Sequence, residues 1–192
     1  MARLLQHPWL LAFAAGIVCI TAMRPLLRHE PAPPPVLSQL PEWALVDSSG
    51  ASFGSADLAG RVWIASFFLT RCAAGCPALT RALASLQQRY RDSGIEDVRL
   101  VSISVDPGFD TPERLADYAE LHGIDPTSWK LLTGDEQRVR DLVQRGFHTP
   151  VEHSERLVLV DRAGAIRGSY GSDASGLDEV FHRSRHVLAE RR

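Results

Sequence analysis

Two nearly continuous apolar runs constrain the fold of this chain more than any other feature. The first covers residues 61–69 and the second covers residues 98–105. Runs of this length without polar alternation are typical of strands that are buried on both faces of a sheet. Between them, a leucine stripe with helical spacing covers residues 77–90 and begins with Pro77, a residue favoured in the first turn of a helix. The pattern predicts a strand, a helix and a second buried strand.

The remaining elements continue this alternation. In chain order we expect a hairpin (43–53), a helix that starts at Asp110 or Thr111 and runs to about residue 122, a strand (129–133), a helix (135–145), a strand hairpin (157–160 and 165–170) and a closing helix (177–189). Strands that alternate with helices and end in a hairpin and a helix predict an α/β fold. The order is that of a thioredoxin-like, three-layer fold with a mixed central sheet.

The N-terminus predicts export of the folded domain. Residues 9–23 carry no charge and are flanked by arginines. This stretch is shorter than the roughly 20 residues of a spanning helix and resembles the apolar core of a signal peptide. We therefore expect residues 1–28 to be an N-terminal hydrophobic anchor helix or a cleaved signal segment, with a buried helix as a third alternative. Residues 29–39 are a proline-rich linker, and residues 40–192 form the domain.

Charge and length exclude one class of function. The chain has 192 residues and a formal net charge of −2. A nucleic-acid-binding domain usually carries a basic patch or stripe, and the sequence shows no long basic run outside its termini. We therefore expect no nucleic-acid partner.

The most informative motif is a pair of cysteines, Cys72 and Cys76, between the first buried strand and its helix. Pro77 places Cys76 at or beside the start of that helix, where the backbone N–H groups favour thiolate over thiol. The short loop can bring both sulfurs together, either bonded to each other or on a shared metal. Thioredoxin-type redox pairs have two intervening residues, whereas this pair has three. Two thiolates and one imidazole suit copper, while a structural zinc site needs four ligands.

Two histidines are candidates for the third ligand. His148 and His153 both lie in the loop before the strand at residues 157–160. In a thioredoxin-like fold that loop faces the cysteine loop at one end of the sheet. His153, next to the entrance of the strand, is the better placed of the two.

At this point the chain resembles the SCO/SenC family of copper-delivery proteins. The matching strings occur in the expected order and cover roughly residues 40 to 190. They are Phe67-Phe68-Leu69-Thr70-Arg71-Cys72-x-x-x-Cys76-Pro77, Val101-Ser102-Ile103-Ser104-Val105-Asp106-Pro107, Asp110-Thr111-Pro112-Glu113 with Leu115 and Tyr118-Ala119, and His153-Ser154 before Leu157-Val158-Leu159-Val160-Asp161-x-x-Gly164. Two features depart from the family pattern: the loop before His153 is short, and the residues between the cysteines are small.

The resemblance implies a membrane-tethered thioredoxin-like domain that binds one copper through Cys72, Cys76 and His153. Copper would be held as Cu(I), with Cu(II) as the alternative, and Asp106 would lie near it as an outer-shell group. A turn aspartate before a proline is the other interpretation of Asp106. The implied partners are cytochrome c oxidase subunit II, at whose binuclear copper site the protein delivers metal or maintains thiols, and an upstream copper donor or thiol reductant. From the N-terminal segment we expect an anchor in a bacterial inner membrane with the domain in the periplasm, or, as the alternative, a cleaved and exported soluble form.

Other functions stay open at the level of sequence. The cysteine pair could belong to a membrane-tethered thiol–disulfide oxidoreductase or a thiol peroxidase, in which one cysteine attacks and the other resolves. The spacing argues against an ordinary thioredoxin, and no peroxidase motif precedes Cys72. A copper or redox sensor is a third alternative. We expect a metallochaperone and not an enzyme.

Overall fold

The computed structural model describes residues 33–72, 76–149 and 155–190, with residues 9, 13 and 16–19 nearer the N-terminus. The chain divides into two compact units, residues 1–32 and residues 33–192. In the first unit the described residues are helical. Within the described ranges, no helix combines the length and the apolar character that crossing a bilayer requires. Most of the predicted anchor or signal segment, residues 1–28, lies outside these ranges.

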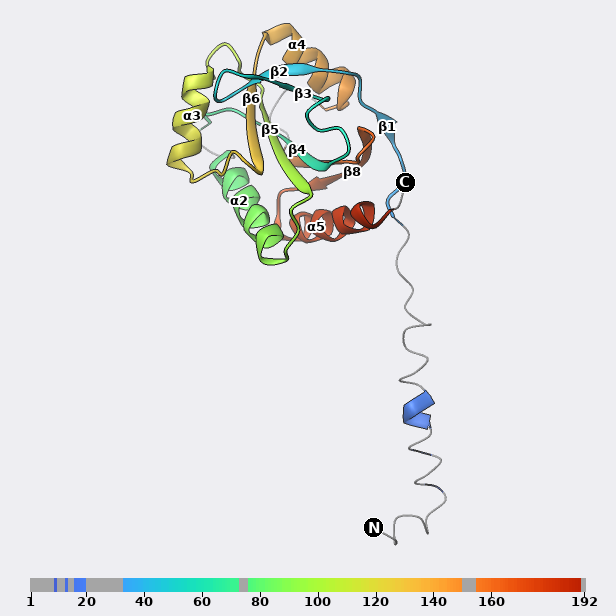
Figure 1. Cartoon of the computed structure of the whole chain (residues 1–192). Coiled ribbons are helices and arrows are strands. Elements are labelled where there is room, and N and C mark those ends of the chain that lie inside the picture. The colour runs from blue at the N-terminus through green and yellow to red at the C-terminus, as the bar shows by residue number, and fades with distance from the viewer. Residues whose placement is uncertain are drawn as a thin grey trace. The chain divides into compact units, whose positions relative to one another are not determined.

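The second unit is built on one mixed sheet, which has eight strands in the described ranges (Figure 1). Its order is β1-β8-β7-β4-β5-β6-β2-β3. The three strands β4, β5 and β6 are parallel to one another, and the other pairings are antiparallel. The strands are β1 (Ser38–Gln39), β2 (Ala44–Asp47), β3 (Ser52–Gly54), β4 (Val62–Phe68), β5 (Val98–Ser104), β6 (Trp129–Thr133), β7 (Arg156–Val160) and β8 (Ala165–Gly171). The predicted α/β class and mixed central sheet are confirmed.

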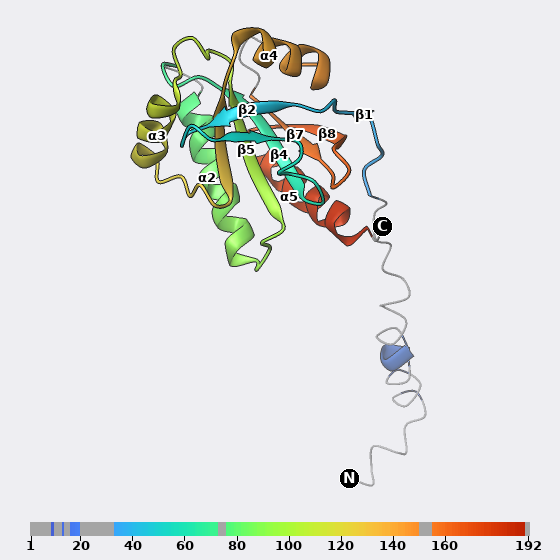
Figure 2. The same cartoon turned by 45° about the horizontal axis from the view of Figure 1, so that its top comes forward.

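Helices cover both faces of this sheet, so the predicted three layers are present. The helices are α2 (Cys76–Asp92), α3 (Pro112–Leu121), α4 (Glu136–Asp141), which continues into the π-helical turn η2 (Leu142–Gly146), and α5 (Ala174–Ala189). Figures 1 and 2 show α2 and α5 side by side on one face, with α4 on the opposite side. Buried side chains form two core clusters, one between the sheet and α2, α3 and α5, and the other between the sheet and α4–η2.

The central strand β4 explains why the core divides in this way. All seven of its residues are buried. Because successive side chains of a strand point to opposite faces, Ile64 and Phe68 pack in the cluster under α2, whereas Trp63 and Phe67 pack in the cluster under α4. A strand with no solvent-exposed face needs an apolar residue at nearly every position, which is the pattern seen in the sequence.

The folded unit begins earlier than residue 40. Ser38 and Gln39 pair with β8, and the N–H of Leu37 donates to the carbonyl of Ile166 at 2.8 Å. The folded unit thus includes residues 33–39, which the sequence assigned to the linker. Proline-rich composition concealed this short strand because prolines cluster just before it, and an edge strand tolerates them.

Candidate metal centre

The first predicted ligand, Cys72, lies in the loop that leaves the carboxyl end of β4. Its backbone N–H donates to the carbonyl of Leu69 at 3.4 Å. The side chain is partly buried and packs against the core cluster under α2. The Cys72 thiol therefore has apolar side chains beside it. In the sequence, α2 begins four residues later.

The second predicted ligand, Cys76, is the first residue of α2, and Pro77 is the second. This confirms the predicted helix start at the cysteine pair. The first N–H groups of a helix have no partners within it, and they favour a negative charge nearby. The side chain of Cys76 and the whole of His153 lie outside the described residues. The described ranges contain no group of three or more His, Cys, Asp or Glu residues that could hold a metal ion, and the three-ligand set stays a prediction.

A buried carboxylate, Asp110, ties the cysteine loop to the end of β5. Asp110 is 0% exposed. Its carboxylate accepts hydrogen bonds from the N–H of Thr70 at 3.1 Å and from the Thr70 hydroxyl, two residues before Cys72. It also accepts one from the Ser104 hydroxyl at 2.5 Å. A carboxylate with several donors is well satisfied in a buried position, so the start of the cysteine loop is held against the neighbouring parallel strand.

Asp106, the predicted outer-shell group, lies beside the cysteine loop. Its Oδ2 atom is 2.5 Å from Nε of Arg71, the residue that precedes Cys72. The angles of this contact are not those of a hydrogen bond, and within the described residues that oxygen accepts no other. The contact is therefore an ion pair between the guanidinium and the carboxylate. Arg71 is more than half exposed, and ion pairs of this kind contribute little to stability. The backbone carbonyl of Asp106 also accepts from Phe109 and Asp110, as expected of a turn aspartate.

The ring of Phe109 completes this support of the loop. The guanidinium of Arg71 lies 4.9 Å from the ring centroid and that of Arg114 lies 3.8 Å from it. Arg114 also donates to the carbonyl of Phe109 at 2.8 Å. Cation–π contacts are weak when they are exposed, but together with the Asp106 ion pair they give the Arg71 side chain a defined position next to Cys72.

The turn that leads to the predicted histidine ligand packs near the same end of β4. The ring of Phe147 meets that of Phe67 edge to face, with centroids 5.1 Å apart. The next residue, His148, is exposed and has φ of 52°, an uncommon value for a residue other than glycine. Thr149 then donates its N–H to the carbonyl of Val143 at 3.1 Å. The chain continues from there toward His153.

Sequence reasoning missed two of these supporting residues. It treated Asp110 as an alternative N-cap of α3, but Thr111 is the cap and accepts from the N–H of Arg114 at 3.4 Å. It gave Arg71 no role. The available signal was the placement of Asp106 and Asp110 just after a buried strand, at the sheet end from which the cysteine loop also leaves.

Comparison with known proteins gives a consistent family assignment. The SCO1/SenC family model matches residues 37–189. The SCO1 protein homolog of Bacillus subtilis (strain 168) is 30% identical over 158 residues, which cover 77% of this chain and 81% of the homolog.

Two solved structures share the fold. One is BsSco, described as a member of the Sco family of cytochrome c oxidase assembly proteins with a disulfide switch. It has a TM-score of 0.74 at 23% identity and covers 83% of this chain and 99% of its own. The other is yeast Sco1 with copper bound, with a TM-score of 0.67 at 22% identity, covering 81% of this chain and 96% of its own. The fold of the described domain is therefore that of Sco proteins. Because the family model spans most of the chain, this protein belongs to the SCO1/SenC family.

Proposed function

We propose that this chain is a copper metallochaperone, which carries one copper ion as cargo on Cys72, Cys76 and His153. The observation that carries the proposal is the anchored cysteine loop, in which Asp110 fixes Thr70 while α2 begins at Cys76. Family membership and the copper-bound yeast relative support it. The two ends of the loop, at Thr70 and at the start of α2, are thus fixed by the fold.

The donor set suits soft cargo that must later be released. Thiolate and imidazole ligands favour Cu(I), and Cu(II) is the alternative state. Both cysteines must be reduced to bind, since a disulfide offers no thiolate. Oxidation of the pair therefore prevents loading. Asp106 supports the site indirectly, by holding Arg71 beside Cys72.

The proposed recipient is the binuclear copper site of cytochrome c oxidase subunit II. The similarity to BsSco, which belongs to the Sco family of cytochrome c oxidase assembly proteins, supports this. In our proposal the recipient's cysteines displace the chaperone's ligands one at a time, so that copper is never free. An upstream copper donor or thiol reductant would restore the reduced, loaded form.

We also propose that residues 1–28 anchor the protein in a bacterial inner membrane, with the domain in the periplasm. The support is the uncharged segment at residues 9–23 followed by a proline-rich stretch. Alkaline extraction of membranes tests this. An anchored chain stays in the pellet, and a cleaved exported chain appears in the soluble fraction without its first residues.

Copper titration of the reduced full chain, in competition with a Cu(I) chelator, tests the ligand set. We expect one tightly held copper per chain, which is lost or greatly weakened in Cys72→Ser, Cys76→Ser and His153→Ala. The matched control is His148→Asn, which removes an exposed imidazole five residues away in the sequence, tolerates the positive φ there and should leave affinity unchanged.

Two outcomes would contradict the proposal. If His153→Ala binds copper like the parent, the ligand set is wrong, and a loss in His148→Asn would identify the other imidazole. If the parent binds no copper tightly, the metallochaperone is wrong altogether.

The second candidate is a thiol–disulfide oxidoreductase, favoured by the position of Cys76 at a helix start. In that reaction the dithiol of Cys72 and Cys76 gives two electrons and two protons to a substrate disulfide and becomes a disulfide itself. Insulin reduction with a coupled reductant tests it. Turnover well above that of a free dithiol would favour this function over copper delivery.

A further inference from the structure

The segment at residues 33–43, which we call the strap, crosses the molecule from one end of the sheet to the other. β1 and β2 stand six strand spacings apart in the sheet order, which would be about 29 Å in a flat sheet. Yet five peptide steps join Gln39 to Ala44, and they reach at most about 18 Å. The sheet must therefore curl, and the strap lies on the face that carries α4, where Leu40 joins the core cluster (Figure 2).

The strap is fastened firmly at its N-terminal part. The carbonyl of Pro34 accepts a hydrogen bond from Nε of Arg167 at 2.8 Å. Arg167 is only 7% exposed, and it also pairs with Glu190 near the end of the domain. Further along, the N–H of Leu40 donates to Gly164 at 3.1 Å. Contacts with β8 and its turn thus fix residues 34–40 on the domain.

The middle of the strap lies directly on η2. A methyl group placed on Gly146, the last residue of η2, would be 3.5 Å from side-chain atoms of both Leu40 and Pro41. Leu40 is 8% exposed and belongs to the core cluster under α4. After Gly146 the chain turns, and Phe147 and Thr149 donate their N–H groups back to carbonyls of η2.

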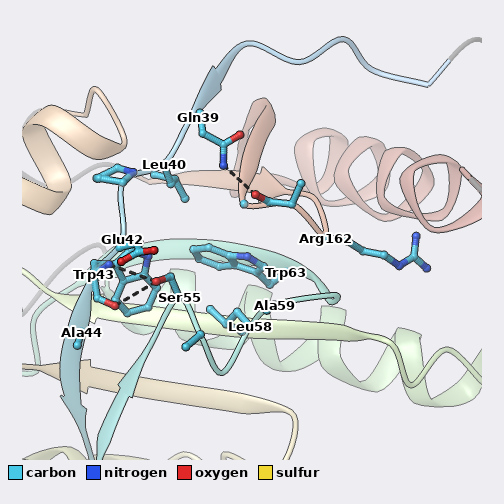
Figure 3. Close-up of a pocket in the computed structure, with 14 residues that line it drawn as sticks. Gln39, Leu40, Glu42, Trp43, Ala44, Ser55, Leu58, Ala59, Trp63 and Arg162 are labelled. Carbon is cyan, nitrogen blue, oxygen red and sulfur yellow. Dashed lines mark hydrogen bonds between the residues drawn. The ribbon is translucent and has the colours of Figure 1, made fainter. Parts of the chain in front are cut away.

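Along its flanks the strap is not closely packed. A cavity of about 700 Å³ lies on one side, lined by Trp43, Leu58 and Trp63 among others (Figure 3). A second cavity of about 800 Å³ lies toward Leu142 of η2. The indole Nε1 of Trp43 is buried without a hydrogen-bond partner in the described part of the chain. The strap therefore contacts the domain at separate points, on β8 and its turn through residues 34–40 and on η2 through Leu40 and Pro41.

We propose that the strap holds the turn at residues 147–149, which leads along the chain to His153, the proposed copper ligand. When Leu40 and Pro41 dock on Gly146, the turn at residues 147–149 is held; when the strap is displaced, the turn loosens and copper is retained less tightly. A π-helical turn followed by a positive φ at His148 is an arrangement that needs such support. The effect on copper rests on the proposed function, whereas the effect on the turn does not.

Hydrogen exchange of the metal-free full chain tests the coupling. In Leu40→Ala we expect the amides of Phe147 and Thr149 to exchange at least about tenfold faster, through local opening, while amides of β5 keep their protection. The matched control is Leu37→Ala. That leucine lies in the same strap but is 61% exposed, and its truncation should change neither region.

Copper affinity is then compared in the same variants. We expect Leu40→Ala to bind copper about tenfold more weakly than Leu37→Ala, a usual size for coupling between sites. If Leu40→Ala unfolds or loses protection throughout β5, the comparison is made with Leu40→Val, which removes a single methylene.

Equal exchange of Phe147 and Thr149 in the Leu40 and Leu37 variants would overturn the coupling. Faster exchange with unchanged copper affinity would overturn its effect on the metal. If the parent itself binds no copper, the proposed function fails, and the exchange comparison still decides whether the strap holds the turn.

Discussion

At the scale of single residues, Asp110 does more for the candidate site than its place in the sequence indicates. A buried carboxylate can hold a loop against a strand when it accepts hydrogen bonds from both, and it does so only while each of those donors stays paired. Thr70 and Ser104 supply those donors from either side. Thr70, two residues before Cys72, is thereby placed by a side chain that is not one of the proposed ligands.

We therefore expect Asp110→Asn to destabilise the domain. One oxygen becomes an NH₂ group that faces the hydroxyl and N–H donors of Thr70 and Ser104, so the free energy of unfolding should fall by about 1–3 kcal/mol. Urea unfolding measures this. The control is Asp135→Asn at the N-cap of α4, where the side chain accepts from Arg138 and asparagine caps about equally well. Equal losses in both variants would contradict a special role for Asp110.

At the scale of elements, the β2–β3 hairpin is joined to β6 partly through a partly buried ion pair. Asp47 at the end of β2 is 3.0 Å from Nζ of Lys130, the only lysine of the chain. Burial by itself would raise the pKa of Asp47, but hydrogen bonds from Ser49 and Lys130 outweigh it and lower that pKa on balance. The charged carboxylate is thus favoured in the folded state.

This lowered pKa predicts a loss of stability in acid. A carboxyl whose pKa is lower when folded contributes stability above its unfolded pKa, about 4, and loses it as the pH falls through the folded value. Between pH 5 and 2 the parent should therefore lose more unfolding free energy than Asp47→Asn. Asp178→Asn is the control. The pKa of Asp178 is also lowered, by Arg89, but its carboxylate is well exposed, so this variant should lose stability in acid almost as the parent does. If Asp47→Asn and the parent lose stability in parallel, the pair with Lys130 does not carry this effect.

At the scale of the whole molecule, the folded unit begins with the strap. Ser38 and Gln39 pair with β8, and the carbonyl of Pro34 accepts from Arg167. A domain cut at residue 40 loses these contacts and exposes the edge of β8, and exposed edges promote association.

We expect a chain that begins at Leu40 to be less stable than one that begins at Pro33. The lost hydrogen bonds of the strap, at about 1 kcal/mol each, should lower the free energy of unfolding by about 2–3 kcal/mol. Thermal unfolding compares the two chains, and light scattering detects association of the shorter one. Equal melting temperatures would show that residues 33–39 do not contribute to the stability of the domain.

The sequence by itself determined the elements and the layers of this protein. The buried strands β4 and β5 and the start of α2 at Cys76 are local consequences of apolar runs, helical spacing and a proline in the first turn. Such patterns act over neighbouring residues, so they can be read without knowing what packs against them. The family resemblance rests on short motifs in a fixed order, which can also be recognised without the structure, and the family model confirms it.

Only the tertiary structure decided which polar groups meet. Asp110 binds Thr70 across 40 positions of sequence, and Arg167 binds the carbonyl of Pro34 across 133. A carboxylate that caps a helix and one that anchors a distant loop look alike in sequence, because their difference lies in which donors the packed sheet brings within hydrogen-bond distance. The strap was hidden for the same reason: β1 exists only because β8 offers it an edge, and no local pattern in a proline-rich stretch records that edge.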